Sequence, residues 1–433
     1  MNVLKVIIGS ILNKIPYAVL PRIGSVYNKY KNDIVDYTQC VNKKEWIFDR
    51  IYHIVEYAVN TIPFYKEFYR IHNFDISQLK SFDDISKIPI ISKLDLQTVP
   101  LELRSNMEYP HYLANTGGST GVPFTFYKSP EHKIKEMAFY HNIWSQLGYQ
   151  KHKLRFQFVG RSEKNGCSYD FSRNQIRASV YESFDVVLKD ITSVNLFCSI
   201  EYLQGYPSVL YEFALYCSNH QTAFLNSKLP KTLKGIFLNS EYPNPLFKET
   251  IQSVFGVSII AGYGLTEGCC IGFNIDSEHY EVDQAYAYTE IVDIDGLSHL
   301  IGTTYDNFVS PLIRYNTNDT VDSATFNDGI LQGFTMNTGG RRGQYILDCD
   351  EKRISLTGLI FGKHHKLFDY CSQLQISQSV KGKAIIYYVP KAELPKEFNP
   401  SILFDAEGIN IEFTFEMISK PIRTKSGKVL LLV

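Results

Sequence analysis

Apolar side chains recur at helical spacing in several stretches of the chain. Residues 43–60 carry apolar side chains three and four positions apart, which predicts an amphipathic helix that ends before Pro63. Similar spacing predicts helices over residues 130–148, 208–217 and 245–255. In the first of these, the buried stripe is expected to consist of Met137, Tyr140, Trp144 and Leu147.

Strand patterns alternate with these helices. Leu154, Phe156 and Phe158 alternate with polar residues and end at Gly160, and residues 235–238 and 257–261 are short apolar runs. This alternation predicts a mixed α/β domain with a substantially parallel sheet. Ligands of such sheets usually lie beyond the carboxyl ends of the strands.

The pattern changes near residues 339–343, where glycine and arginine interrupt it. The chain beyond has its own predicted strands at 384–389 and 411–415 and ends in a polar tip at 423–428. We therefore predict an N-terminal amphipathic segment (1–42), a large mixed α/β domain (43–342) and a small, mobile α+β C-terminal domain (343–433).

Composition narrows the function classes. The 433 residues contain 44% hydrophobic residues and have a net charge of −1, which is typical of a globular protein and argues against nucleic acid as a partner. Eight cysteines form no CxxC pair, which predicts free thiols in the cytoplasm. Adjacent Cys269 and Cys270 are interpreted as buried small side chains rather than a redox pair.

The first 22 residues are apolar but interrupted. Lys5, Asn13, Lys14 and Pro16 break the run, so it is too short to span a bilayer, and it lacks a clear signal-peptide pattern. An apolar helical face remains, which would pack against the protein itself or lie on the inner membrane surface.

Residues 116–124 (TGGSTGVPF) form a stretch rich in backbone donors and hydroxyl groups. Its glycines allow successive N–H groups to face one anion, which suits a phosphate, although a surface turn has the same composition. It is neither a Walker A motif nor a dinucleotide fingerprint. A positive charge would have to come from elsewhere, with Lys428 and Arg341 as candidates.

A second polar group follows the predicted strand 257–261. Tyr263, Thr266 and Glu267 lie just past its end, where they could contact a base, a phosphate and Mg²⁺, although a strand ending in a turn is the simpler interpretation. Asp319 adds a carboxylate that could accept hydrogen bonds from both ribose hydroxyls.

Together these segments resemble a known signature. TGGSTGVPF (116–124), NSEYP (239–243), AGYGLTE (261–267), PLIRYNTND (311–319) and RTKSGK (423–428) occur in the order found in the adenylate-forming superfamily. The chain is most similar to its phenylacetate–CoA ligase branch, particularly the CapK-like proteins of capsule and surface-polysaccharide loci.

The resemblance implies roles for individual residues. ATP phosphates would be held by the loop formed by Thr116, Gly117, Gly118, Ser119, Thr120 and Gly121. Adenine would lie between Ser240, Glu241 and Tyr242 on one side and Gly262 and Tyr263 on the other. Thr266 would bind the α-phosphate, Glu267 the metal, Asp319 the ribose, and Arg341 the ribose and phosphate; Lys428 would be the mobile catalytic lysine.

Two positions depart from the family pattern. Asn318 replaces the glycine of the usual Thr-Gly-Asp, which stiffens the turn before Asp319. Gln344 stands where the hinge segment usually has an aspartate, which puts the domain rotation of the second half-reaction in doubt.

The resemblance implies a ligase that uses ATP and Mg²⁺ to adenylate a carboxylic acid, releases pyrophosphate and transfers the acyl group to CoA or an amine, in capsular or surface polysaccharide biosynthesis. The acid is expected to contact Tyr140, His141, Trp144, Phe237 and Ala261. The alternative is a catalytically impaired nucleotide-binding protein that assembles with a membrane-associated polysaccharide complex. Contact of residues 1–22 with a membrane and formation of a homodimer are further partner hypotheses.

Overall fold

The computed structural model describes residues 3–21, 23–115, 124–160, 167–336, 345–361, 365–424 and 429–433. The chain divides into two compact units. Unit 1 comprises Met1–Asn13, His152–Ile259 and Asn337–Val433, and unit 2 comprises residues 14–151 and 260–336. The boundaries proposed at residues 42 and 342 stay a prediction.

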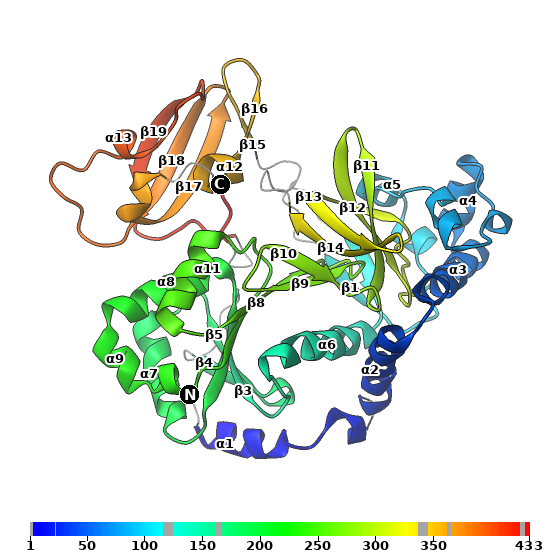
Figure 1. Cartoon of the computed structure of the whole chain (residues 1–433), viewed down its shortest axis with the longest axis horizontal. Coiled ribbons are helices and arrows are strands. Elements are labelled where there is room, and N and C mark those ends of the chain that lie inside the picture. The colour runs from blue at the N-terminus through cyan, green and yellow to red at the C-terminus, as the bar shows by residue number, and fades with distance from the viewer. Residues whose placement is uncertain are drawn as a thin grey trace. The chain divides into compact units, whose positions relative to one another are not determined.

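The parallel sheet predicted from the alternating pattern lies in unit 1. Strands β7 (Gly235–Leu238), β6 (Ile200–Gly205), β3 (Leu154–Val159) and β5 (Gln175–Ser179) pair in this order and in parallel, and β4 (Cys167–Asp170) adds an antiparallel edge. Helices α7 (Phe184–Asn195), α8 (Pro207–Asn219), α9 (Gln221–Asn226) and α11 (Pro245–Phe255) connect or flank these strands (Figure 1). The short helix α10 (Leu229–Thr232) precedes β7, and η6 (Phe171–Arg173) precedes β5.

Local sequence explains where α11 begins and ends. The Asn244 side chain accepts a hydrogen bond from Leu246 N, Pro245 occupies the first turn, and Gly256 follows in the left-handed region at φ +67°. Its buried face packs on α8, where the rings of Phe247 and Tyr211 stack with centroids 4.4 Å apart.

The end of unit 1 forms a smaller C-terminal domain, as the sequence predicts. It contains β15 (Tyr345–Leu347), β16 (Arg353–Ser355), α12 (Leu356–Phe361), η7 (Lys366–Asp369), β17 (Cys371–Val380), β18 (Lys383–Pro390), α13 (Pro400–Leu403) and β19 (Glu412–Met417). β17 and β18 are antiparallel, whereas β18 and β19 are parallel. Buried residues from Ile346 to Phe404 form a hydrophobic cluster belonging to this domain.

Unit 2 combines helices with an antiparallel sheet that the sequence patterns did not predict. The strand order is β11 (Ala287–Ile294), β12 (Leu297–Thr304), β13 (Tyr315–Asn327), β14 (Ile330–Met336), β10 (His279–Val282), β9 (Ile271–Ile275) and β8 (Ile259–Gly264). A separate hairpin pairs β1 (Tyr112–Asn115) with β2 (Thr125–Lys128). The first residue of β8, Ile259, ends a segment of unit 1. The antiparallel pairing of β8 with β9 therefore starts at Ile260, inside unit 2.

The helices of unit 2 are α2 (Gly24–Gln39), α3 (Lys43–Thr61), α4 (Pro63–Ile71), α5 (Lys93–Gln97) and α6 (Glu131–Trp144), with short turns η1 (Tyr17–Val19), η2 (Ile76–Gln78), η3 (Phe82–Lys87), η4 (Leu101–Arg104) and η5 (Ser145–Leu147). The helix expected over 43–60 is confirmed as α3, and its apolar face joins the main hydrophobic core of this unit.

The expected buried stripe of α6 is wrong in part. Trp144 is buried, but Met137, Tyr140 and Leu147 are only partly buried, and the polar side chains of His132 and Lys135 lie inside instead. Periodicity failed here because charged partners compensate these buried polar groups: Asp306 pairs with Lys135, and Glu136 of the same helix contacts His132.

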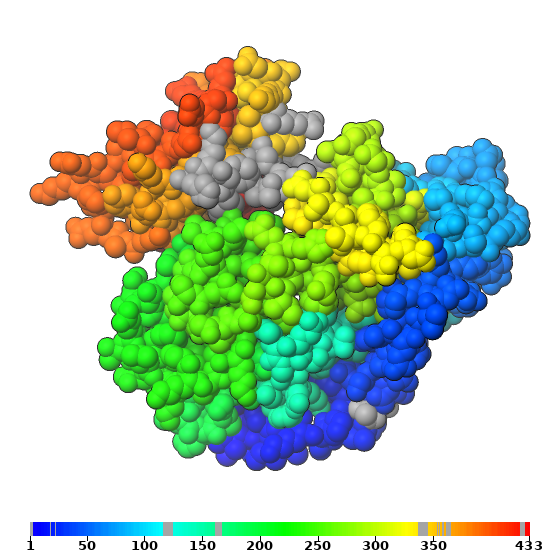
Figure 2. Space-filling view, in the orientation of Figure 1, coloured from blue at the N-terminus to red at the C-terminus, as the bar shows by residue number. Residues whose placement is uncertain are grey.

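The N-terminal helix α1 (Val3–Leu12) packs one face on unit 1. Val6 and Gly9 are buried, and Asn13 Nδ2 donates a hydrogen bond to Phe171 O. Leu4 and Ile11 on the other face are exposed, and the dark blue atoms of this segment lie at the surface in Figure 2. In the described part of the chain, no helix combines the length and apolar character needed to cross a bilayer.

The predicted free thiols are confirmed, and the cytoplasmic location stays a prediction. All eight cysteines are free, and Cys269 and Cys270 are buried. Burial raises the pKa of both thiols, so they remain protonated and unreactive near neutral pH.

Candidate active site

Tyr263 and Asp319, both predicted site residues, meet in unit 2. Tyr263 lies near the end of β8 and donates a hydrogen bond through Oη to Asp319 Oδ2 at 2.7 Å. Asp319 is only 1% exposed, so this hydrogen bond compensates part of the cost of burying its carboxylate. The Tyr263 ring packs edge-on against Phe334, which fixes the orientation of its hydroxyl group.

Asn318, the asparagine that departs from the family pattern, makes a local turn inside strand β13, where the pairing with β12 shifts register. Asn318 adopts φ +61°, in the left-handed region that favours glycine and tolerates asparagine. Its N–H donates to Asn316 Oδ1, and Asp319 N donates to Thr317 Oγ1. The turn therefore keeps the backbone geometry that a glycine would provide.

Thr266 and Glu267 lie in the turn between β8 and β9. Thr266 is exposed, whereas Glu267 is 9% exposed and its Oε1 lies 3.4 Å from Tyr315 Oη, which donates to it. Burial, followed by the charge of Glu267, raises the pKa of Tyr315, so the phenol keeps the proton that it donates. The turn thus presents a hydroxyl group beside an oriented carboxylate.

A lysine that sequence reasoning passed over supports this turn. Lys128, the last residue of β2, is buried, and its Nζ donates a hydrogen bond to Thr266 O at 2.8 Å. Burial lowers the pKa of Lys128, while the carboxylates of Glu136 and Glu267 oppose that shift. No local pattern marks this lysine, because only the tertiary fold brings it to the turn.

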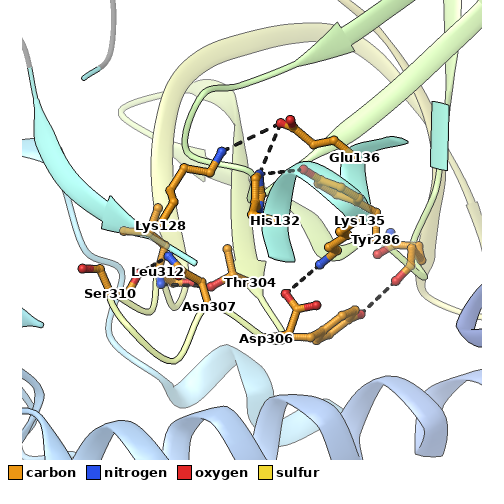
Figure 3. Close-up of polar contacts among 12 residues, drawn as sticks. Lys128, His132, Lys135, Glu136, Tyr286, Thr304, Asp306, Asn307, Ser310 and Leu312 are labelled. Atoms are coloured by element: carbon orange, nitrogen blue, oxygen red, sulfur yellow. Dashed lines mark hydrogen bonds and ion pairs between the residues drawn. The ribbon is translucent and has the colours of Figure 1, made fainter. Parts of the chain in front are cut away.

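Lys128 also belongs to a buried polar network with helix α6 (Figure 3). Its Nζ lies 3.8 Å from Glu136 Oε1, and His132 Nε2 lies 3.2 Å from the same oxygen. Lys135 on the same helix pairs with Asp306 at 2.8 Å. These contacts explain why α6 buries polar side chains.

In unit 1, the three residues of the predicted adenine segment follow β7. Ser240 is exposed and adopts φ +69°, and Tyr242 is also exposed. Glu241 accepts hydrogen bonds from Ser208 N at 3.1 Å and from Val429 N at 2.8 Å. Its carboxylate therefore connects the start of α8 with Val429 near the C-terminus, and its contact with adenine stays a prediction.

Several predicted site residues lie outside the described residues. These are the phosphate-loop residues from Thr116 to Gly121, the hinge residues Arg341 and Gln344, and Lys428. Gly262 is described, is partly buried and pairs with Phe273.

The residues expected to contact the acid are divided between the two units, and their grouping around one substrate stays a prediction. Tyr140 and Trp144 lie on α6 with rings 5.4 Å apart, and Ala261 is buried in β8. His141 instead contacts Tyr27 Oη through Nδ1 and stacks on Tyr17. Phe237 is buried in unit 1 and stacks on Tyr202.

The described residues offer no metal site built from protein side chains without help from a substrate. That part of the chain holds no group of three histidine, cysteine or acidic side chains suited to one ion. A single carboxylate such as Glu267 still suits Mg²⁺, which commonly takes one or two protein carboxylates together with substrate phosphates and water.

Comparison with solved structures identifies the fold. The chain superposes on 2-hydroxyisobutyryl-CoA ligase in its postadenylation state with R3-HIB-AMP at a TM-score of 0.65, with 14% identity over 91% of this chain and 90% of that one. The chain has the fold of an adenylate-forming CoA ligase. The complex of the same ligase with 2-HIB-AMP superposes with a TM-score of 0.59 and the same coverage of both chains. The open conformation of that ligase with 2-HIB-AMP and CoA superposes with a TM-score of 0.54 at 16% identity. This match covers 73% of the present chain and 79% of the ligase chain.

Searches at the sequence level add no relative: no family model and no curated protein matches the chain. At 14–16% identity, the structural similarity establishes the fold. The assignment of activity must therefore rest on the residues of the site.

Proposed function

We propose that this protein is an ATP-dependent ligase that adenylates a carboxylic acid, releases pyrophosphate and then transfers the acyl group to CoA or an amine. The observation that carries the proposal is the pairing of Tyr263 with Asp319 beside the turn that holds Thr266 and Glu267. Four motif residues that lie up to 56 positions apart in sequence are brought together in unit 2 of a fold shared with a CoA ligase.

In the first half-reaction, a carboxylate oxygen of the acid attacks the α-phosphorus of ATP, and the bond to the β-phosphate oxygen breaks. Thr266 would donate its hydroxyl hydrogen to the α-phosphate, and Asp319 would accept hydrogen bonds from the ribose hydroxyls. Lys428 would add positive charge where negative charge builds up. Mg²⁺ held by Glu267 would neutralise charge on the departing pyrophosphate.

In the second half-reaction, a thiol or amine attacks the acyl carbonyl carbon, and AMP leaves with the electrons of the carbon–oxygen bond. CoA is the acceptor in the branch that the motifs resemble, and the complex of the neighbouring ligase with CoA supports that class. An amino sugar or another amine is the alternative acceptor, because the motifs also resemble proteins of polysaccharide loci.

The finer assignment follows from the motif resemblance alone. Within the adenylate-forming superfamily we place the chain in the phenylacetate–CoA ligase branch, among CapK-like proteins, with a cytoplasmic role in capsule or surface polysaccharide synthesis. The phrases IPFYKEF (62–68) and ISLTGLIFGKHH (354–365) support this placement.

The test is a screen of carboxylic acids by ATP–pyrophosphate exchange, followed by mass spectrometry with CoA or candidate amines. We expect exchange only when a suitable acid is present, and an acyl product only when an acceptor is added. Acid-dependent formation of ADP and phosphate would contradict adenylation, because it requires cleavage at the γ-phosphate.

A further inference from the structure

Side chains of α6 lie along the whole turn between β8 and β9. The ring of His132 occupies the space beside Gly268, where an added Cβ would lie 2.2 Å from Cε1. A Cβ added at Gly264 would lie 3.3 Å from Tyr140 Oη. His132, Glu136 and Tyr140 follow one another at intervals of four positions and therefore share one face of the helix.

Glu136 is close to the middle of the turn. Lys128 Nζ lies 2.8 Å from Thr266 O and 3.8 Å from Glu136 Oε1. The distance between these two oxygens is therefore at most the sum of the two contacts. Figure 3 shows the Lys128 and His132 side chains both directed toward the Glu136 carboxylate.

The network holds Glu136 as an oriented carboxylate. Burial lowers the pKa of His132, so the neutral imidazole donates its Nε2 hydrogen to Glu136 Oε1, with Tyr286 Oη 3.4 Å from the same nitrogen. The side chains of Lys128 and His132 are 5% and 6% exposed, whereas that of Glu136 is 37% exposed. Glu136 is thus the member of this trio that reaches solvent.

We propose that Glu136 recognises a hydrogen-bond donor on the acid, which makes hydroxy- or amino-substituted carboxylic acids the substrate class. This inference rests on the proposed function, which places the reacting carboxylate next to Thr266. The remainder of the acid would then extend along α6. A purely hydrocarbon group would remove water from the Glu136 carboxylate without replacing its hydrogen bonds, whereas a hydroxyl or ammonium group would restore them.

The test compares matched acids in ATP–pyrophosphate exchange with the full-length protein. Each aliphatic or aromatic acid is supplied in three forms, in which one substituent is a methyl, hydroxyl or amino group. We expect the wild type to favour a hydroxyl or amino form over the methyl form by at least about tenfold in kcat/KM. Glu136→Leu should abolish that preference, so that the hydroxyl, amino and methyl forms of one acid give equal kcat/KM values within this variant.

Two further variants separate the explanations. Glu136→Gln retains an acceptor but loses the charge, so it should keep the preference for a hydroxyl group and weaken the preference for an ammonium group by about tenfold. Glu131→Leu makes the same change at an exposed position of α6 and should behave as wild type.

The outcomes are distinct for the two proposals. A wild type without preference, or a preference that survives in Glu136→Leu, would overturn the substrate class while leaving adenylation intact. If Glu136→Leu fails to fold, an unchanged selectivity between the amino and hydroxyl forms in Glu136→Gln would overturn the proposal equally. Exchange with none of the acids in any form would reject the proposed function, and this inference with it.

Discussion

At the scale of single residues, the site depends on groups that are buried and paired. Tyr263 with Asp319 and Tyr315 with Glu267 are pairs in which a tyrosine hydroxyl orients a carboxylate. Lys128 adds a buried ammonium that binds the backbone of the same turn. Removing such a charge leaves its partners without compensation in a poorly solvated environment, which costs more than an exposed contact.

Lys128→Met is expected to lower kcat of ATP–pyrophosphate exchange by about 10- to 100-fold, because the turn that carries Thr266 and Glu267 loses its charged hydrogen bond. As a positioning residue, Lys128 should affect kcat more than the KM for ATP. Lys133→Met, an exposed neighbour on α6, is the control. Equal loss of kcat in both variants, or a change in KM alone, would contradict the positioning role.

At the scale of elements, helices and parallel strands were the predictable part. Residues 235–238 and 245–255 form β7 and α11 with the predicted bounds, because apolar runs and capping residues coincide there. The buried face of α6 was mispredicted, since His132 and Lys135 are buried through partners distant in sequence. The antiparallel strands after residue 271 were not predicted, because long-range pairing rather than local pattern determines them.

The turn at Asn318 gives a test at this scale. Asn318→Gly should change the free energy of unfolding by less than about 1 kcal/mol, because glycine adopts φ +61° without strain, which offsets its larger loss of chain entropy on folding. Asn318→Ala should cost about 1–2 kcal/mol, since alanine is strained in the left-handed region. Urea denaturation measures both. If alanine costs no more than glycine, the turn does not require this backbone conformation.

At the scale of the whole molecule, short motifs made the fold predictable, whereas the phenylacetate–CoA ligase branch that they also indicated stays a prediction. Five motifs in order led to the fold that the structural comparison identifies, although identity to the matching ligase is 14%. Cores accept many substitutions that preserve volume and burial, so a fold outlasts recognisable sequence similarity. The positions of Thr116 to Gly121, Arg341 and Lys428 lie outside the described residues, and their roles stay predictions.

Stability of the whole chain should depend on pH through Glu212 of α8. This carboxylate pairs with Arg423 at 2.9 Å, but burial raises its pKa from an ordinary 4.5 to about 7. The folded protein therefore holds a proton that the unfolded chain releases above pH 4.5. The stabilisation that comes from protonated Glu212 is fully present below pH 4.5 and is lost as the pH rises toward 7.

Glu212→Gln should accordingly flatten the decline in unfolding free energy between pH 4.5 and 7, by up to about 1.4 kcal/mol per pH unit at the steepest point. Chemical denaturation across this range provides the measurement. Glu249→Gln, at an exposed position of α11, is the matched control and should retain the wild-type slope. An identical slope in the Glu212 variant would show that this carboxylate is ionised in the folded protein throughout.

Glu267, held by Tyr315 beside Thr266, is the residue on which the proposed adenylation reaction depends most. ATP–pyrophosphate exchange with an accepted acid and Mg²⁺ tests this dependence most directly, comparing Glu267→Gln with Glu278→Gln at an exposed position in the same unit. We predict acid-dependent exchange in the wild type and in the Glu278 variant, and a loss of about 100-fold or more in the Glu267 variant. Equal exchange in all three proteins, or no acid-dependent exchange in the wild type, would contradict the account.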